Sequence, residues 1–460
     1  GDEDSAAELM ASLNTASAPE ALRRELLLIA LRTARLSGDR RQAADSALAL
    51  YRMGGHSDFS ADDAEQALWS AVQGISAPVS RETGWHSWWT LAQAARLDDG
   101  ADAAVAIAQW LAANGDHPAV ARAQSIERAS LADAALARPA VLVPMSGPLA
   151  RAGNAVASGT LAAYYAHNQA NPQRPQQIFL IDSRRYNRME DAYAAALAEQ
   201  SDLLIGPLGK LQVSELLGAG FSDIPLLTLN RPDPLVAATS MSLQLSLAPE
   251  DEAALIARRA FAAGGRSALL VRPEGDWGDR MEAALLADWR DVGGQLRSRA
   301  VFSQPSGYSS ALQTALKLDA STIRQRDIRK LFTDPVESVG QRRADIDVIF
   351  LLTRNAEEAR ALKPLINYHY AGDLPVYALS TADDGGTGNR DLNGLRLPVM
   401  PWRLGTLPPG IAEGESAAAS APLHALGVDA WALGQRAYRL ASGTGLEHGG
   451  YTGQLRVGPN

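Results

Sequence analysis

The hydrophobic pattern of this chain changes near residue 140, and this change constrains the fold more than any other feature. Stretches rich in Ala, Leu and Arg with helical spacing precede it. Val141–Val143 is then a short apolar run, typical of a fully buried parallel strand, and Ser146-Gly147-Pro148 ends it before a helical pattern resumes over Leu149–Tyr165. The sequence therefore predicts an all-helical part followed by a part in which strands and helices alternate.

The turn after Val143 brings the end of a strand to the N-terminus of a helix. Unpaired backbone amides at such a point can bind an anion or a carbonyl group. Because nearly every open α/β sheet contains this arrangement, an ordinary connection without a ligand is the first interpretation of the segment taken alone. Gly153 and Gly159 would let the following helix lie close to the sheet, or let the chain bend near a ligand.

Residues 1–136 are predicted to form helical hairpins. Breaks in the pattern occur at 37–39, 53–55, 74–78, 98–100 and 114–116. A shift of the sequence by 60 residues superposes matching positions: Leu28 on Trp88, Leu31 on Leu91, Ala44 on Ala104, Leu48 on Ala108 and Tyr51 on Leu111. This spacing is typical of tetratricopeptide-like repeats, whose solenoids present a surface to a partner. A plain helical bundle is the alternative.

Residues 139–460 are predicted to form two α/β lobes with parallel sheets, because more than six strands alternate with helices. The expected strands are 141–143, 178–181, 203–205, 226–229, 268–271, 299–302, 348–352 and 376–379. We expect lobe 1 to contain residues 139–245 and about 396–445, and lobe 2 to contain about 246–395 and the C-terminal segment. Segments 385–389 and 408–421 are expected to be weakly ordered loops.

Composition excludes several functional classes. A net charge of −9 and a pI near 5.4 argue against a nucleic-acid binder, which needs a concentrated basic face. The arginine clusters, at 23–24, 184–185, 258–259 and 324–330, are interpreted as solvated helix faces. No apolar run approaches the ~18 residues of a membrane helix. The chain has no cysteine and begins Gly1-Asp2-Glu3-Asp4, so we interpret it as a mature or trimmed chain.

No arrangement of residues points to catalysis, a metal or a cofactor. The seven histidines show no metal-ligand spacing, and Ser146 lacks the Gly-x-Ser-x-Gly pattern of a nucleophile. Asp345 and Asp347 would point to one face at a separation of ~7 Å, which suits a glycosidase pair. Carboxylates beside a buried strand are more often solvated or paired with a neighbouring arginine, so we expect no catalytic role and count a glycan hydrolase as the weakest hypothesis.

Segments spread in order over about 300 residues match known families. The set that resembles type I periplasmic binding proteins is Val143–Leu149, Leu180–Asp182, Leu204–Leu208, Leu227–Asn230 and Asp276–Gly278. The set that resembles the LpoA (LppC-like) family is Arg343–Phe350, Lys363-Pro364, Tyr370–Tyr377 with Ser380, Met400–Trp402 and Gly450–Leu455. The resemblance covers residues 139–457, and it extends to the N-terminal helices only in their tetratricopeptide-like architecture.

The resemblance implies a periplasmic lipoprotein of the outer membrane that controls peptidoglycan synthesis and cell shape. Members of this family activate a bifunctional class A penicillin-binding protein without being enzymes, so the expected partner is that synthase. Peptidoglycan is a further expected contact, and no cofactor is implied. The lipidated cysteine expected at the mature N-terminus is missing from the sequence given. The α/β part would dock on the synthase, and the helices would supply reach and a second contact surface.

A small-molecule receptor is the alternative function, since this fold often closes two lobes on a ligand. The residues expected to line the cleft in that case follow predicted strands or carry aromatic rings: Ser146, Asp182, Gly206, Asn230, Trp277 and Trp402. Asp182 and Asn230 could hydrogen-bond a ligand. A carboxylate in such a position also caps helices or pairs with an arginine such as Arg184.

Overall fold

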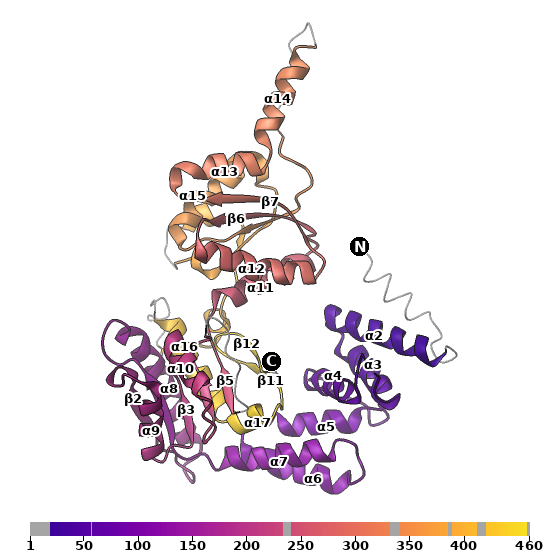
Figure 1. The fold of residues 1–460 in the computed structure, drawn as a ribbon, viewed down its shortest axis with the longest axis vertical. Helices are drawn as coiled ribbons and strands as arrows, with labels where there is room; N and C mark the ends of the chain where they lie inside the picture. Colours follow the sequence, from indigo (N-terminus) through magenta and orange to yellow (C-terminus); the bar gives the residue numbers. More distant parts are fainter. Residues whose placement is uncertain are drawn as a thin grey trace. The chain divides into compact units, whose positions relative to one another are not determined.

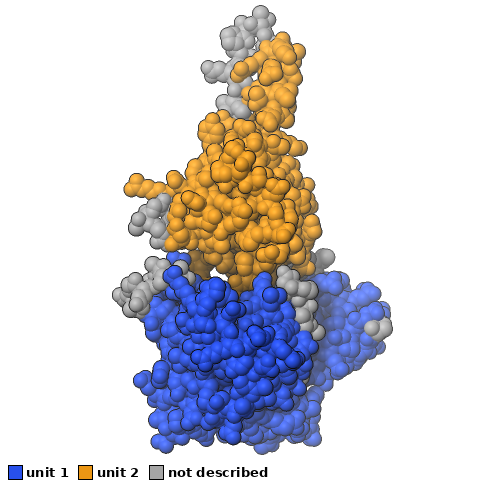
Figure 2. Space-filling view, turned by 60° about the vertical axis from the view of Figure 1, so that its left-hand side comes forward, with its two compact units in different colours: residues 1–246, 401–460 blue, residues 247–400 orange. Residues whose placement is uncertain are grey.

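A computed structural model describes residues 19–56, 58–232, 241–331, 341–384, 389–411 and 420–457. The chain divides into two compact units (Figure 2). The first unit contains residues 1–246 and 401–460, and the second contains residues 247–400. Among the helices of the described segments, none combines the length and the apolarity that a membrane crossing requires.

The first unit begins with consecutive helices, as predicted (Figure 1). They are α2 (Glu20–Ser37), α3 (Arg40–Arg52), α4 (Ala61–Gln73), α5 (His86–Ala95), α6 (Gly100–Ala113) and α7 (Val120–Ala134). The predicted breaks coincide with the ends of these helices. Side-chain caps start several of them: Asp39 caps α3, Asp99 caps α6, and Ser60 forms a capping box with Asp63 on α4.

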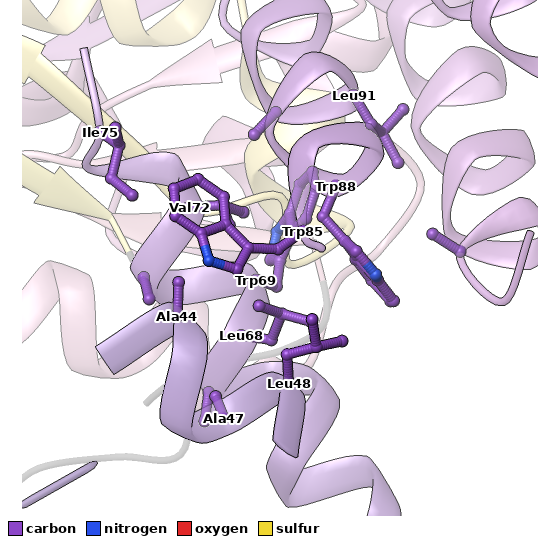
Figure 3. Close-up of a cluster of buried hydrophobic side chains, with 14 of the residues drawn as sticks. Ala44, Ala47, Leu48, Leu68, Trp69, Val72, Ile75, Trp85, Trp88 and Leu91 are labelled. Carbon is purple, nitrogen blue, oxygen red and sulfur yellow. The ribbon is translucent and has the colours of Figure 1, made fainter. Parts of the chain in front are cut away.

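Tryptophans fill the core between these helices (Figure 3). Trp69 and Trp88 are fully buried and belong to one apolar cluster that also contains Leu68 and Leu91. Tyr51 meets Trp88 edge to face, with ring centroids 6.0 Å apart. Alanines occupy the positions where neighbouring helices approach, as Ala44 and Ala47 do on α3. Large rings against small residues explain why this Ala-rich sequence packs as a defined stack.

The first unit continues with a parallel five-stranded sheet of order β2-β1-β3-β4-β5. Its strands are β1 (Pro139–Val143), β2 (Phe179–Asp182), β3 (Leu203–Ile205), β4 (Leu226–Thr228) and β5 (Ser242–Gln244). The helices of this part are α8 (Ala150–Ala170), α9 (Met189–Ala198), α10 (Lys210–Ala219), α16 (Ala421–Gly434) and α17 (Ala437–Ala441). Every residue of β1, β3 and β4 is buried, as the continuous apolar runs predicted.

The second unit repeats this topology. Its parallel sheet has the order β10-β9-β8-β6-β7, which is the same arrangement numbered from the other edge. The strands are β6 (Ser267–Pro273), β7 (Gln295–Phe302), β8 (Val348–Leu351), β9 (Val376–Ala378) and β10 (Leu395–Arg396). The helices are α11 (Pro249–Ala262), α12 (Asp276–Asp291), α13 (Tyr308–Ala315), α14 (Leu318–Arg329) and α15 (Ala356–Ile366).

Equivalent residues perform the same structural task in both units. Asp202 precedes β3, and its carboxylate accepts hydrogen bonds from the backbone N–H groups of Ala137 (2.6 Å) and Arg138 (2.9 Å), which precede β1. Asp347 precedes β8, and its carboxylate accepts from the N–H groups of Arg266 (3.1 Å) and Ser267 (2.8 Å) at the start of β6. The two carboxylates thus fix the first strand of each sheet to the third.

The C-terminal segment lies in the first unit, whereas the sequence analysis assigned it to lobe 2. Strands β11 (Leu446–Gly449) and β12 (Gln454–Val457) pair with each other in antiparallel fashion. Asp429 of α16 is buried, and it accepts hydrogen bonds from the N–H groups of Tyr451 and Thr452, both 2.8 Å long. A buried carboxylate needs donors, and this turn supplies them. The predicted loops at 385–389 and 408–421 fall mostly outside the described residues.

A buried ion pair joins the helices of the first unit to its α/β part. Asp133 of α7 and Arg439 of α17 are 0% and 2% exposed at their side chains, and Arg439 Nε lies 2.7 Å from Asp133 Oδ2. The same guanidinium donates to the carbonyl oxygens of Ala95 and Leu97. Gln73 of α4 adds donor bonds to two carbonyls of the 444–445 turn. Polar groups that satisfy each other in this way hold the two parts in register.

The pair predicts an unusual dependence of stability on pH. Burial raises the pKa of Asp133 to about 6 from its ordinary 3.8, against the opposing effect of Arg439. Because the folded state then binds this proton more tightly, the contribution of Asp133 to stability is present below pH ~4 and is lost as the pH rises through about 6. We expect the difference in free energy of unfolding between the native chain and the Asp133→Asn variant to change by about 2 kcal/mol between pH 4 and pH 7.

Urea denaturation of both proteins at several pH values measures this difference. The native chain should gain stability relative to the variant as the pH falls. A difference that stays constant across the range would contradict the prediction.

Candidate functional site

Four of the six predicted site residues lie along one edge of the first sheet. Ser146 follows β1, Asp182 ends β2, Gly206 follows β3, and Asn230 comes two residues after β4. These strands are parallel neighbours in the order β2-β1-β3-β4. Because the carboxyl ends of parallel strands meet at one edge, the four residues form a row there. We call this row the strand-end site.

Asp182 organises the turn that contains Ser146. Its Oδ1 accepts hydrogen bonds from the backbone N–H groups of Met145 (2.9 Å) and Arg184 (3.0 Å). Partial burial acts to raise the pKa of Asp182, but hydrogen bonds from the Ser146 side chain and from these amides outweigh it, so the pKa is lowered. The carboxylate is therefore ionised at neutral pH and is already engaged by its own chain, as a cap of the short helical turn that follows.

Gly206 and Asn230 shape the other half of the strand-end site. Gly206 has φ +118°, and a Cβ on it would lie 2.0 Å from the carbonyl oxygen of Leu142, so only glycine fits between β1 and β3. The side-chain amide of Asn230 donates to the carbonyl oxygen of Leu208 at 3.0 Å, and its Oδ1 accepts from the N–H of Arg231 at 2.9 Å. Both the amide nitrogen and the carbonyl oxygen of the Asn230 side chain are thus hydrogen-bonded to backbone groups of the surrounding loops.

The two tryptophans serve different parts of the protein. Trp402 lies in the first unit, where it is 3% exposed and its backbone N–H donates to the carbonyl oxygen of Tyr451 in the C-terminal segment. Trp277 lies in the second unit on α12, half-buried against the apolar cluster that contains Leu285 and Trp289. Both rings have packing roles within their own units, and a ligand role for either stays a prediction.

Asp345 and Asp347, the carboxylates considered as a catalytic pair, are both engaged in hydrogen bonds within the protein. Arg343 forms two hydrogen bonds with Asp345, of 2.6 and 2.7 Å, and these lower the pKa of Asp345 to about 2. Asp347 holds backbone amides at the start of β6. A carboxyl with so low a pKa is a poor general acid near neutral pH. Of the two structural roles considered for these carboxylates, pairing with a neighbouring arginine is confirmed for Asp345, and the geometry offers no acid and base pair.

His369 also has a structural partner. It is buried, its Nε2 lies 2.9 Å from the Ser309 hydroxyl, and burial lowers its pKa. No acid orients this histidine among the hydrogen bonds of the described residues, so the pair lacks the third member of a nucleophilic triad. Within the same described segments, no group of three or more acidic or histidine side chains has the geometry to hold a metal ion.

One family model matches almost the whole length of the chain. A family model described as "LppC putative lipoprotein" matches residues 30–460. Proteins named "Penicillin-binding protein activator LpoA" match at 26% identity from Vibrio antiquarius, over 76% of this chain and 60% of the relative, and at 26% identity from Photobacterium profundum, over 76% and 59%. This chain thus spans about 60% of the length of these curated relatives.

Two solved structures show the same fold. Full-length LpoA from Haemophilus influenzae superposes with a TM-score of 0.59 at 18% identity, over 98% of this chain and 80% of that protein. A "putative branched-chain amino acid ABC transporter" from Chromobacterium violaceum gives a TM-score of 0.52 at 25% identity, over 70% of this chain and 95% of that protein. These likenesses confirm the predicted fold class: an N-terminal helical part followed by a two-lobed periplasmic-binding-protein fold.

Proposed function

This chain belongs to the LppC lipoprotein family, and on that premise we propose that it is a regulator without catalytic activity of its own. It binds a bifunctional class A penicillin-binding protein and activates the transpeptidase activity of that synthase. The observation that carries the proposal is the match to named penicillin-binding protein activators over 76% of this chain. The corresponding location is the periplasmic face of the outer membrane, reached through a lipid anchor.

The geometry supports a binding role over a chemical one. At the strand-end site, Asp182 and Asn230 are engaged by backbone groups of their own chain, and Asp345 is held by Arg343. Such groups shape a surface but are not poised to move protons. Activation then requires the regulator to bind the active conformation of the synthase more tightly than the inactive one. A coupling of ~1–3 kcal/mol would produce a roughly 5- to 150-fold effect.

Purified synthase and lipid II substrate test the proposal directly. Adding the whole chain should raise the fraction of cross-linked muropeptides at least ~5-fold. The chain should also co-purify with the synthase. The whole chain is preferable to its halves, because separating them near residue 137 would break the buried ion pair between Arg439 and Asp133. A parallel reaction with a β-lactam should abolish the gain. Binding that leaves cross-linking unchanged would contradict the proposal. Co-sedimentation with peptidoglycan sacculi tests whether the chain also contacts peptidoglycan.

A small-molecule receptor is the second candidate function. It is favoured by the likeness, at 25% identity, to a protein described as a putative branched-chain amino acid ABC transporter, and by the four residues of the strand-end site. Titration with amino acids, muropeptides and nucleotides distinguishes the two functions. Saturable binding that is lost in the Asp182→Ala variant, without any effect on synthase cross-linking, would support the receptor.

A further inference from the structure

Helix α14 of the second unit leaves the body of its own unit. Figure 1 shows it extending beyond α13 and away from the sheet formed by β6 and β7. Leu318 and Ser321 at its start are buried, but from Thr322 to Arg329 every residue except Gln325 is exposed. A helix in water gains little stability from propensity alone, so an extension of this kind, without a core of its own, is unusual. We call residues 322–331 the projecting helix surface.

This surface exposes large apolar side chains. Ile323 is 54% exposed, Ile328 is 48% exposed and Leu331 is 81% exposed. At about 3.6 residues per turn, these three fall on one side of the helix, and Thr322, Arg326 and Arg329 fall on the other. Single exposed apolar residues are ordinary, whereas three on one side of a protruding helix form a patch that a partner can cover.

The same surface is basic, although the chain as a whole has a net charge of −9. Arg324, Arg326, Arg329 and Lys330 lie within it, against Asp327 alone. Lys330 pairs with Asp327 at 3.0 Å, and no ion pair among the described residues joins the three arginines to a carboxylate. Exposed guanidinium groups match carboxylates in a fixed fork geometry. The complementary surface is therefore acidic.

A segment that is hydrogen-bonded near the base of the helix carries two exposed tyrosines. Gln341 N–H donates to Ser321 of α14, and the next residue, Arg342, donates to the carbonyl oxygen of Tyr370. Tyr368 is 74% exposed and Tyr370 is 54% exposed, and Tyr370 has φ +60°, an uncommon conformation for a residue with a side chain. Tyrosine and arginine are enriched at protein interfaces.

We propose that the projecting helix surface inserts into an acidic, apolar-lined groove of the bifunctional synthase and is the contact through which this chain engages it. The inference rests on the function proposed above and names the part of the chain that docks. A protein groove fits better than a lipid surface, because Asp327 lies on the apolar side between Ile323 and Leu331. A helix that lies in a membrane interface needs an uninterrupted apolar face.

The double variant Arg326→Glu/Arg329→Glu tests the charge. We expect its dissociation constant for the purified synthase to rise at least ~30-fold at low salt, because like charges would then face each other. Binding by the native chain should also weaken when NaCl is raised from about 50 to about 300 mM, and the variant should lose most of this dependence. The matched control is Arg259→Glu/Arg290→Glu, which makes the same charge change at exposed positions of α11 and α12 and should bind like the native chain.

Ile323→Ser tests the apolar side against Leu255→Ser, since both side chains are 54% exposed in the second unit. We expect Ile323→Ser to bind the synthase about 10-fold more weakly than the native chain, and Leu255→Ser to bind with unchanged affinity. Circular dichroism confirms that each variant is folded. In a parallel experiment, binding of each protein to vesicles that contain an anionic phospholipid is measured, and no variant should differ from the native chain in this binding.

The outcomes separate the two proposals. A native chain that fails to bind the synthase overturns the proposed function. A native chain that binds, with both α14 variants binding equally well, overturns the docking inference alone. Loss of vesicle binding in the α14 variants, with synthase binding intact, overturns it in favour of a membrane contact.

Discussion

Replacing Arg439 by alanine should lower the free energy of unfolding by about 3–5 kcal/mol. The substitution leaves Asp133, which has no exposed side-chain surface, without the cation that it faces at 2.7 Å. It also leaves the carbonyl oxygens of Ala95 and Leu97 without their donor. A buried charge without a partner retains the whole cost of its desolvation, and this cost exceeds what the pair contributed when intact.

Urea denaturation at pH 7 measures the free energy of unfolding that Arg439→Ala loses. Two further variants test whether this loss comes from the buried charge. Arg258→Ala removes a partner of Asp288 from a pair that is 58% and 28% exposed, and it should cost no more than about 1 kcal/mol. The double variant Asp133→Leu/Arg439→Met should be less destabilised than Arg439→Ala, because it leaves no charge buried. An Arg439→Ala protein as stable as the Arg258→Ala control would show that the pair is not closed in solution.

Replacing Gly159 by alanine should destabilise the first unit by about 3 kcal/mol. Gly159 lies where α8 crosses α16, and a Cβ on it would lie 1.9 Å from the carbonyl oxygen of His424. The opposite helix has the same requirement, since a Cβ on Gly427 would lie 2.2 Å from the carbonyl oxygen of Val156. Both obstacles are backbone atoms, so the helices would have to move apart to admit a methyl group.

Gly218→Ala is the matched control for this prediction. Gly218 is an exposed residue within α10 of the same unit, and a Cβ on it meets nothing within 4 Å. Alanine there should stabilise the protein by about 0.5–1 kcal/mol, because it reduces the freedom of the unfolded chain. Thermal denaturation of both variants should therefore give shifts of opposite sign. Equal shifts would mean that the α8–α16 crossing is looser than the structure shows.

The sequence alone predicted the elements whose patterns are local. Val141–Val143 and Val348–Leu352 were recognisable as strands because a strand buried on both faces needs a continuous apolar run, whichever residues cover it. The breaks between the N-terminal helices were recognisable because Gly and Asp mark helix ends. The row of residues at the strand-end site could also be predicted, since parallel strands end at one edge.

What the sequence could not supply depends on residues far apart in the chain. Asp133 and Arg439 are separated by 306 positions, and nothing near either one signals its partner. The sequence also gave no sign that the C-terminal segment donates hydrogen bonds to Asp429, because these contacts form only in the folded unit. The arginines of residues 324–330 were interpreted as a solvated helix face, and the sequence did not reveal that Ile323 and Ile328 are exposed with them.

Hydrophobic period and end signals are properties of a few consecutive residues, so the sequence by itself determined the helical part, the paired α/β lobes and the resemblance that led to the family. Burial is a property of what surrounds a residue after the chain has closed on itself. Only the tertiary structure could therefore decide that Asp182 and Asn230 are bound by their own loops, that a buried ion pair joins α7 to α17, and that α14 extends into solvent with an apolar and basic surface.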